Sequence, residues 1–121
     1  MAPTKLRIAI VEDQKDLGET LTDFFNSQPG MTCVANFSSA EEALQKLASK
    51  RPDLLILDIN LPGMTGTAAI PGLLSQLPDL KILMHTVHDD SEQLFASIKA
   101  GATGYLLKSS RPDRLLEAVS E

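Results

Sequence analysis

The sequence predicts an α/β fold, in which helices cover both faces of a five-stranded parallel sheet. Five short apolar runs, rich in β-branched residues, alternate along the chain with five longer amphipathic stretches. Such alternation is typical of right-handed βαβ units, which build parallel sheets. The apolar runs are continuous, as expected for strands that are buried on both faces. The chain of 121 residues is long enough for one such domain, which buries roughly 65% of its unfolded surface.

The first strand is expected at residues 6–11 and the second at residues 32–36. A helix is predicted between them, because its apolar residues recur with helical spacing and therefore share one face. These residues are Leu17, Leu21, Phe24 and Phe25. Pro29-Gly30 is expected to end this helix.

The second helix is expected to follow Ser39, because Ser39 and Glu42 have the spacing of a capping box. Its predicted apolar face consists of Ala40, Ala43, Leu44 and Leu47. Arg51-Pro52 ends the helix, and the third strand is expected at residues 54–57.

Pro71 and Gly72 fall inside the segment that should form the third helix. Proline removes a backbone hydrogen bond and clashes with the preceding turn. We therefore expect a kink, a late start or a break in this helix. The fourth strand is expected to follow at residues 80–85.

A fourth helix is predicted at residues 91–100, with Asp89-Asp90 as its cap and Gly101 as its end. Its inward-facing residues are expected to be Leu94, Phe95 and Ile98.

The fifth strand is expected at residues 104–107, and Ser110 is expected to cap the last helix. Pro112 suits the first turn of that helix, because proline has no N–H to leave unpaired there. The apolar face of this helix is predicted to consist of Leu115, Leu116 and Val119.

Composition narrows the classes of function. The formal net charge is −5, from 11 basic and 16 acidic residues, so the chain lacks the broad positive surface with which proteins bind nucleic-acid backbones. Cys33 is the single cysteine, which excludes an internal disulfide and a cysteine-cluster zinc site and fits a reducing compartment. No apolar run is long enough to span a bilayer, and no signal peptide is visible.

Polar residues follow four of the predicted strands. Glu12 and Asp13 follow the first strand, Asp58 the third, Thr86 the fourth and Lys108 the fifth. The carboxyl ends of parallel strands share one edge of the sheet, which is also where open α/β sheets bind ligands. Three carboxylates, a hydroxyl and an ammonium group are therefore expected to converge there.

Crowded carboxylates repel one another unless a cation is present. Ligands that are all oxygen, without histidine or cysteine, favour a hard ion such as Mg²⁺. A lysine and a hydroxyl beside the metal would supply the charge and the donors that a phosphoryl group requires. These residues therefore indicate phosphoryl chemistry at a magnesium site.

Three segments carry a family resemblance. The residues at 10–13 (Ile-Val-Glu-Asp), 57–66 (Leu-Asp-Ile-Asn-Leu-Pro-Gly-Met-Thr-Gly) and 101–108 (Gly-Ala-Thr-Gly-Tyr-Leu-Leu-Lys) resemble the signatures of response-regulator receiver domains of bacterial two-component systems. The segment 99–109 is more narrowly similar to the NarL/FixJ, or LuxR-type, subfamily. The resemblance implies a CheY-like, flavodoxin-like (βα)5 doubly wound sheet of strand order 2-1-3-4-5.

The resemblance also implies a role for each site residue. Asp58 would accept a phosphoryl group, and Asp13, Asp58 and the backbone carbonyl of Asn60 would bind Mg²⁺. Glu12 would act through a water on the metal. Two residues would act on the phosphoryl group itself, Lys108 through its charge and Thr86 through its hydroxyl. Tyr105 would be the switch aromatic that turns inward as Thr86 moves.

For the whole chain, the resemblance implies one receiver domain at residues 1–121 that acts as a regulatory domain, in which the only catalysis is its own phosphotransfer and autodephosphorylation. The phosphoryl donor would be a sensor histidine kinase or a phosphotransfer protein, and phosphorylation would promote homodimer formation. Output would be transcription, through a C-terminal helix-turn-helix DNA-binding domain that this chain does not contain. A cytoplasmic location, away from membranes, is expected.

Two alternatives remain open. One is a receiver fold that binds a partner without phosphorylation. The other is a phosphohydrolase of the haloacid dehalogenase type, which is disfavoured because Asn60 stands where a second aspartate is needed.

Ser109 follows Lys108 where many relatives have proline. A cis bond without proline would cost about 3 kcal/mol, so the geometry of the bond between Lys108 and Ser109 is left open.

Overall fold

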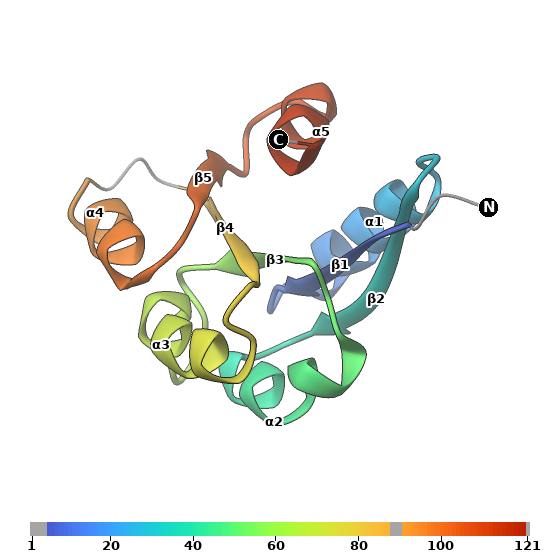
Figure 1. Ribbon diagram of the computed structural model, residues 1–121. Helices are drawn as coiled ribbons and strands as arrows, with labels where there is room; N and C mark the ends of the chain where they lie inside the picture. Colours follow the sequence, from blue (N-terminus) through green and yellow to red (C-terminus); the bar gives the residue numbers. More distant parts are fainter. Residues whose placement is uncertain (1–4, 88–90, 121) are drawn as a thin grey trace.

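The computed structural model describes residues 5–87 and 91–120, which form a central parallel sheet between two layers of helices (Figure 1). The strand order is β2-β1-β3-β4-β5, and every neighbouring pair is parallel. The fold class and the strand order are thus confirmed. Along the chain the elements are β1 (Leu6–Val11), α1 (Lys15–Asn26), β2 (Met31–Phe37), α2 (Ala40–Lys50), β3 (Leu54–Asp58), α3 (Gly66–Gln76), β4 (Lys81–Thr86), α4 (Ser91–Ala100), β5 (Gly104–Leu107) and α5 (Pro112–Ser120).

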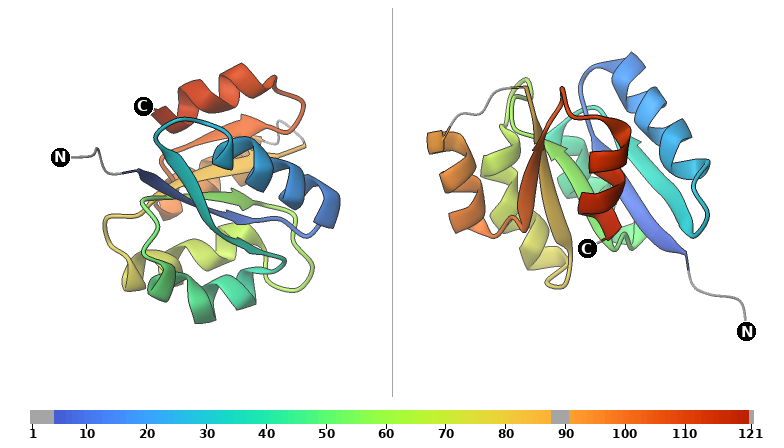
Figure 2. Two further views of the ribbon diagram at one scale, coloured as in Figure 1. Left: turned by 90° about the vertical axis from the view of Figure 1, so that its right-hand side faces the viewer. Right: turned by 90° about the horizontal axis from the view of Figure 1, so that it is seen from above.

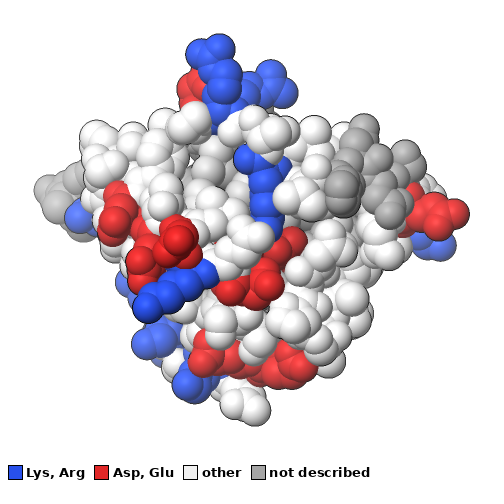
Figure 3. Space-filling view, turned by 180° about the vertical axis from the view of Figure 1, so that it is seen from behind, with Lys and Arg blue, Asp and Glu red and all other residues white. Residues whose placement is uncertain are grey.

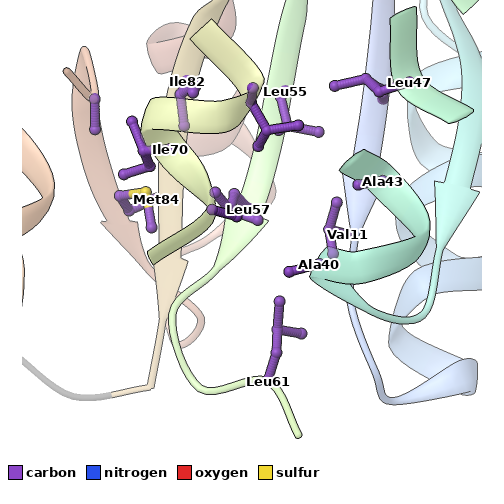
Figure 4. Close-up of a cluster of buried hydrophobic side chains, with 14 of the residues drawn as sticks. Val11, Ala40, Ala43, Leu47, Leu55, Leu57, Leu61, Ile70, Ile82 and Met84 are labelled. Atoms are coloured by element: carbon purple, nitrogen blue, oxygen red, sulfur yellow. The ribbon is translucent and has the colours of Figure 1, made fainter. Parts of the chain in front are cut away.

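The helices divide between the two faces of the sheet, as the views in Figure 2 show. Helices α1 and α5 cover one face, where Phe25 and Leu115 pack against Ile10 and Ile56. Helices α2, α3 and α4 lie on the other side. Figure 4 shows the core on that side, in which side chains of β3 and β4 meet those of α2 and α3. Its labelled members are Val11, Ala40, Ala43, Leu47, Leu55, Leu57, Leu61, Ile70, Ile82 and Met84.

Helix α2 begins as the sequence predicts, with one difference in the capping box. The Ser39 hydroxyl accepts a hydrogen bond from the Glu42 N–H at 3.1 Å. The Glu42 carboxylate reaches back to the N–H of Ser38, at 3.3 Å, which is one residue before the cap. Both ends of the box still satisfy backbone donors that the first turn leaves free.

Helix α3 begins directly after Thr65 and continues through Pro71 to Gln76, so the prediction of a late start or a break is wrong. The Thr65 hydroxyl caps the helix by accepting from the Ala68 N–H at 3.2 Å. Ile70 and Leu73, on either side of the proline, are fully buried. Tertiary packing of this kind offsets the hydrogen bond that proline removes.

The predicted inward face of α4 is also wrong in part. In α4, Leu94 is buried as expected, but Phe95 is 67% exposed and Ile98 45% exposed. The buried stripe of α4 instead contains Ser97, which hydrogen-bonds to Thr67 of α3 at 2.9 Å, so that Phe95 and Ile98 lie on the solvent side.

Helix α5 begins at Pro112, so the residue before its first turn is Arg111, and Ser110 lies one position too early to be the cap. Arg111 is exposed, and its carbonyl accepts from the N–H groups of Arg114 and Leu115. The predicted Asp89-Asp90 cap of α4 lies outside the described residues.

The described residues contain no cis peptide bond, and this includes the bond between Lys108 and Ser109. None of the helices in the described ranges is both long enough and apolar enough to cross a membrane.

Candidate functional site

The three acidic residues at the carboxyl edge of the sheet come together as predicted. Glu12 and Asp13 directly follow β1, and Asp58 is the last residue of the neighbouring strand β3. One carboxylate oxygen from each of these residues lies within 4.8 Å of the other two. Glu12 and Asp58 are each 3% exposed, whereas Asp13 is open to solvent. The site is therefore accessible from the side of Asp13.

Lys108 supplies a cation to this cluster. Its Nζ atom donates to Asp58 Oδ2 at 2.8 Å and lies 2.7 Å from Glu12 Oε1. The lysine is held at this edge by its own backbone, because the Lys108 N–H donates to the carbonyl of Thr86 at 2.6 Å. The loop after β5 is thereby tied to the end of β4, and the ammonium group is placed between two carboxylates.

The surroundings of the site shift the pKa values of Glu12 and Lys108. Burial raises the pKa of Glu12, and the contact with Lys108 offsets this effect only in part. Burial by itself would lower the pKa of Lys108, but its close contacts with the carboxylates of Asp58 and Glu12 raise it above its ordinary value. Lys108 is therefore a permanent cation at this site.

The composition of the cluster fits a hard divalent cation. Three carboxylates face one lysine, so negative charge is in excess. Glu12 Oε1 is fully buried and makes no hydrogen bond of acceptable geometry within the described residues, although Lys108 lies close to it. Oxygen ligands without histidine or cysteine suit Mg²⁺. The residues present thus match the metal that the sequence predicts.

The loop between β3 and α3 is held by several hydrogen bonds. The Asn60 N–H donates to Asp58 Oδ1 at 3.1 Å, and the Gly66 N–H donates to the Ile59 carbonyl at 3.0 Å. From α2, the carboxylate of Glu41 accepts from the Met64 N–H at 3.2 Å. The loop that contains Asn60 is therefore fixed from both of its ends and from a neighbouring helix.

Gly66 allows α3 to start against the end of β3. A Cβ atom at this position would overlap the backbone carbonyl of Asp58. We expect Gly66→Ala to lower the free energy of unfolding by about 3 kcal/mol, because neither backbone can move without disturbing the site. Gly104→Ala is the matched control, since its Cβ would make an ordinary contact at 3.6 Å with Leu83. Urea unfolding of both variants measures the difference, and equal stabilities would contradict this role of Gly66.

Thr86 and Tyr105 differ in their exposure to solvent. Thr86 ends β4 and is 2% exposed, next to the ends of β3 and β5. Tyr105 lies on β5, an edge strand, opposite Met84, and is 46% exposed. Tyr105 is thus in an outward position, from which the family resemblance implies that it turns inward. That turn, and the roles assigned to Asp58, Lys108 and the metal ligands, stay predictions.

His85 lies beside the site, on the face of the sheet that α1 and α5 cover. It is 6% exposed, and burial, with a further contribution from the charge of Lys108, lowers its pKa from 6.5 to about 4. The ring is therefore neutral at physiological pH.

The depressed pKa of His85 predicts a pH dependence of stability. Because the unfolded chain binds a proton at about pH 6.5 and the folded chain only at about pH 4, stability is lost as the pH falls through this window. We expect the free energy of unfolding to fall by about 2 kcal/mol from about pH 7 to about pH 5. In His85→Leu the same interval should show a much smaller change. Equal slopes for the two proteins in urea unfolding would contradict the assignment to His85.

The charges of the face drawn in Figure 3 lie in small groups of both signs. Acidic groups gather around the middle of this face, and its described part carries no broad basic surface. This distribution agrees with the net charge of −5.

Two features of the site were missed by sequence reasoning. The sequence gives no sign that Glu41, in the first turn of α2, contributes to the site, yet its carboxylate holds the loop that contains Met64. The direct pairing of Glu12 with Lys108 was also not predicted. The positions of these residues at strand and helix ends placed them near the site, but no sequence pattern specifies which side chains pair across a site.

Comparison with known proteins finds the same family that the sequence resembles. The family model of the response regulator receiver domain matches residues 8–120. The chain is 39% identical to the oxygen regulatory protein NreC of Staphylococcus epidermidis over 115 residues, which cover 94% of this chain and 53% of that protein. It is 34% identical to the transcriptional regulatory protein DegU of Brevibacillus brevis over 115 residues, which cover 95% of this chain and 49% of that protein.

The chain thus spans about half the length of these relatives. Among solved structures, a two-component response regulator of the LuxR family from Aurantimonas sp. SI85-9A1 is similar to it, with a TM-score of 0.90 and 31% sequence identity. That similarity covers 97% of this chain and 84% of the other.

Proposed function

Because this chain belongs to the response regulator receiver domain family, we propose that Asp58 accepts a phosphoryl group and thereby switches a protein-binding surface. The observation that carries the proposal is the position of Asp58. Its carboxylate is buried at the end of β3, grouped with Glu12 and Asp13, and hydrogen-bonded to Lys108 at 2.8 Å. Receiver domains are regulatory and bind Mg²⁺ at an acidic pocket, and this acidic cluster corresponds to such a pocket.

The proposed reaction is a phosphoryl transfer to a carboxylate. A carboxylate oxygen of Asp58 forms a bond to phosphorus as the bond between phosphorus and a histidine nitrogen of a kinase or phosphotransfer protein breaks. The histidine leaves as a neutral imidazole after taking up a proton, and Asp58 becomes an acyl phosphate. Lys108 already touches Asp58 Oδ2, so its charge is in place for the phosphoryl oxygens.

Asp13, Asp58 and the backbone carbonyl of Asn60 would hold Mg²⁺, and Glu12 would contribute through a water. When bound, the cation neutralises the charge that develops on the phosphoryl oxygens. The chain prepares this site by fixing the loop after β3, since the Asn60 N–H binds Asp58 Oδ1 and the Met64 N–H binds Glu41. Hydrolysis of the acyl phosphate by water would then release inorganic phosphate and return the domain to its resting state.

Incubation with acetyl phosphate and Mg²⁺, followed by measurement of the intact mass, tests the proposal. We expect the mass to increase by one phosphoryl group, and we expect the increase to disappear when a chelator removes Mg²⁺. A receiver domain known to be phosphorylated under the same conditions serves as the control. An unchanged mass for this chain, with a labelled control, would contradict the proposal.

We propose that phosphorylation of Asp58 changes the surface formed by α4, β5 and α5. Phe95 and Ile98 of α4 and Tyr105 of β5 are exposed there, and Lys99 lies over the ring of Phe95 at 5.7 Å. Exposed aromatic and aliphatic side chains of this kind are suited to contact with a partner. Thr86 and Lys108 would link this surface to the site, because both would interact with the phosphoryl group only after it is installed.

We expect activation with Mg²⁺ and beryllofluoride, which mimics a phosphorylated aspartate, to strengthen self-association or partner binding through this surface. Sedimentation velocity and hydrogen exchange at Tyr105 measure the response. The Thr86→Ala variant is expected to lose both effects, because it lacks the hydroxyl that would move toward Asp58. If wild type and Thr86→Ala behave alike and exchange at Tyr105 is unchanged, this surface is not the switch.

For the full-length protein we propose a regulator of transcription, with a sensor histidine kinase as the phosphoryl donor and a LuxR-type DNA-binding domain as the output. The supporting observation is that relatives such as DegU and NreC are about twice as long as this chain and are named as regulatory proteins. An interaction module that works without phosphorylation is not favoured, since every residue that phosphorylation requires in this family is present.

A further inference from the structure

We infer that a cavity between α1 and α5 is a binding site for a small apolar molecule that carries one hydroxyl group. The cavity has a volume of about 200 Å³ and is separate from the acidic site. Its apolar lining includes Leu17, Leu21, Phe24, Leu106 and Leu115. The inference goes beyond the proposed function, because it requires neither Mg²⁺ nor phosphorylation.

The size and lining of the cavity define the class of ligand. An apolar cavity of roughly 150 Å³ in a protein core is large enough for benzene. The space beside α1 is slightly larger, and its walls are made mostly of leucine, phenylalanine and proline side chains. A single aromatic ring or a short branched alkyl group would therefore fill it, and a charged molecule would lose its hydration without finding a partner.

His85 is the second observation that indicates a ligand. The residue lines the cavity and is 6% exposed, and its ring nitrogens are not among the fully enclosed, unpaired polar atoms of the described residues, so they are accessible from the cavity. A neutral imidazole has one donor and one acceptor nitrogen. A hydroxyl on the ligand can serve as donor to one of these nitrogens or as acceptor from the other.

The opening of the cavity allows such a molecule to enter. Thr20 of α1 and Pro112 of α5 are exposed residues of the lining, and Ser110 is half-buried beside them. The apolar floor and the histidine are reached between these residues. A mostly apolar pocket with a few polar groups is the usual form of a small-molecule site.

The test uses phenol and toluene as probes, with the unphosphorylated domain in the absence of Mg²⁺. We expect phenol to shift the backbone amide resonances of Leu106 and Leu107 and to bind roughly fivefold more tightly than toluene, as one hydrogen bond would provide. In His85→Leu the preference for phenol should disappear. In Thr20→Phe, in which a ring fills the cavity from the surface, neither probe should bind.

Glu19→Phe is the matched control for Thr20→Phe, since it adds the same ring to α1 at an exposed residue outside the lining. This variant should bind phenol as wild type does. The inference is overturned if phenol shifts no resonance of the lining, if wild type binds phenol and toluene equally, or if Thr20→Phe still binds both. If Thr20→Phe changes sedimentation while phenol does not bind, a second copy of the chain occupies the cavity, and the ligand proposal fails.

Discussion

The Asp58→Asn variant is expected to acquire no phosphoryl group at this site from acetyl phosphate, even at saturating Mg²⁺. An amide is a poor nucleophile compared with a carboxylate, and the substitution also removes one negative charge from the proposed metal site. The effect should be a complete loss of labelling, because the substitution removes the carboxylate at the end of β3 that Lys108 and the Asn60 N–H contact.

Asp79→Asn is the control for this substitution. Asp79 is an exposed carboxylate that precedes β4, at the opposite edge of the sheet. The control variant should be labelled to the same extent as wild type. Labelling of Asp58→Asn with wild-type stoichiometry would show that the phosphoryl group resides elsewhere and would contradict the assignment of Asp58.

The Lys108→Ala variant is expected to bind Mg²⁺ nearly as well as wild type but to show no conformational response to beryllofluoride. Lys108 contacts Asp58 Oδ2 and Glu12 Oε1, so it supplies charge to the site and no metal ligand. Without it the phosphoryl oxygens lose their cationic partner, and the loop after β5 loses the interaction that would couple it to phosphorylation.

Two measurements test this division of roles. Magnesium titration followed by amide resonances should give similar affinities for wild type and Lys108→Ala, whereas Asp13→Asn should bind much more weakly, since it loses a proposed ligand. Lys81→Ala removes an exposed lysine at the far end of β4 and should leave both affinity and response unchanged. A fall in affinity in Lys108→Ala as steep as in Asp13→Asn would contradict this account.

Much of the fold could be predicted because it rests on local patterns. Continuous apolar runs indicated the strands, and the residues at their carboxyl ends were expected to meet because parallel strands end on one edge. The structure places Glu12, Asp13, Asp58 and Lys108 together at that edge. The strand order came from the family resemblance, since periodicity alone does not specify which strands are neighbours.

The parts that sequence reasoning missed depend on tertiary packing. Phe95 and Ile98 have the spacing of a buried face, but α4 turns Ser97 toward Thr67 of α3 and leaves both apolar residues in solvent. Pro71 would disrupt an isolated helix, whereas here the burial of its neighbours holds α3 together. A single sequence contains no signal for which face a helix at the edge of a sheet presents to its neighbour.

The most direct test of the central claim is to locate the phosphoryl group. After phosphorylation with acetyl phosphate and Mg²⁺, borohydride reduces an acyl phosphate on aspartate to the alcohol homoserine, and peptide mass spectrometry identifies the modified residue. We expect homoserine at position 58 alone, in a yield that depends on Mg²⁺. Homoserine at another aspartate, with Asp58 unmodified, would contradict the account.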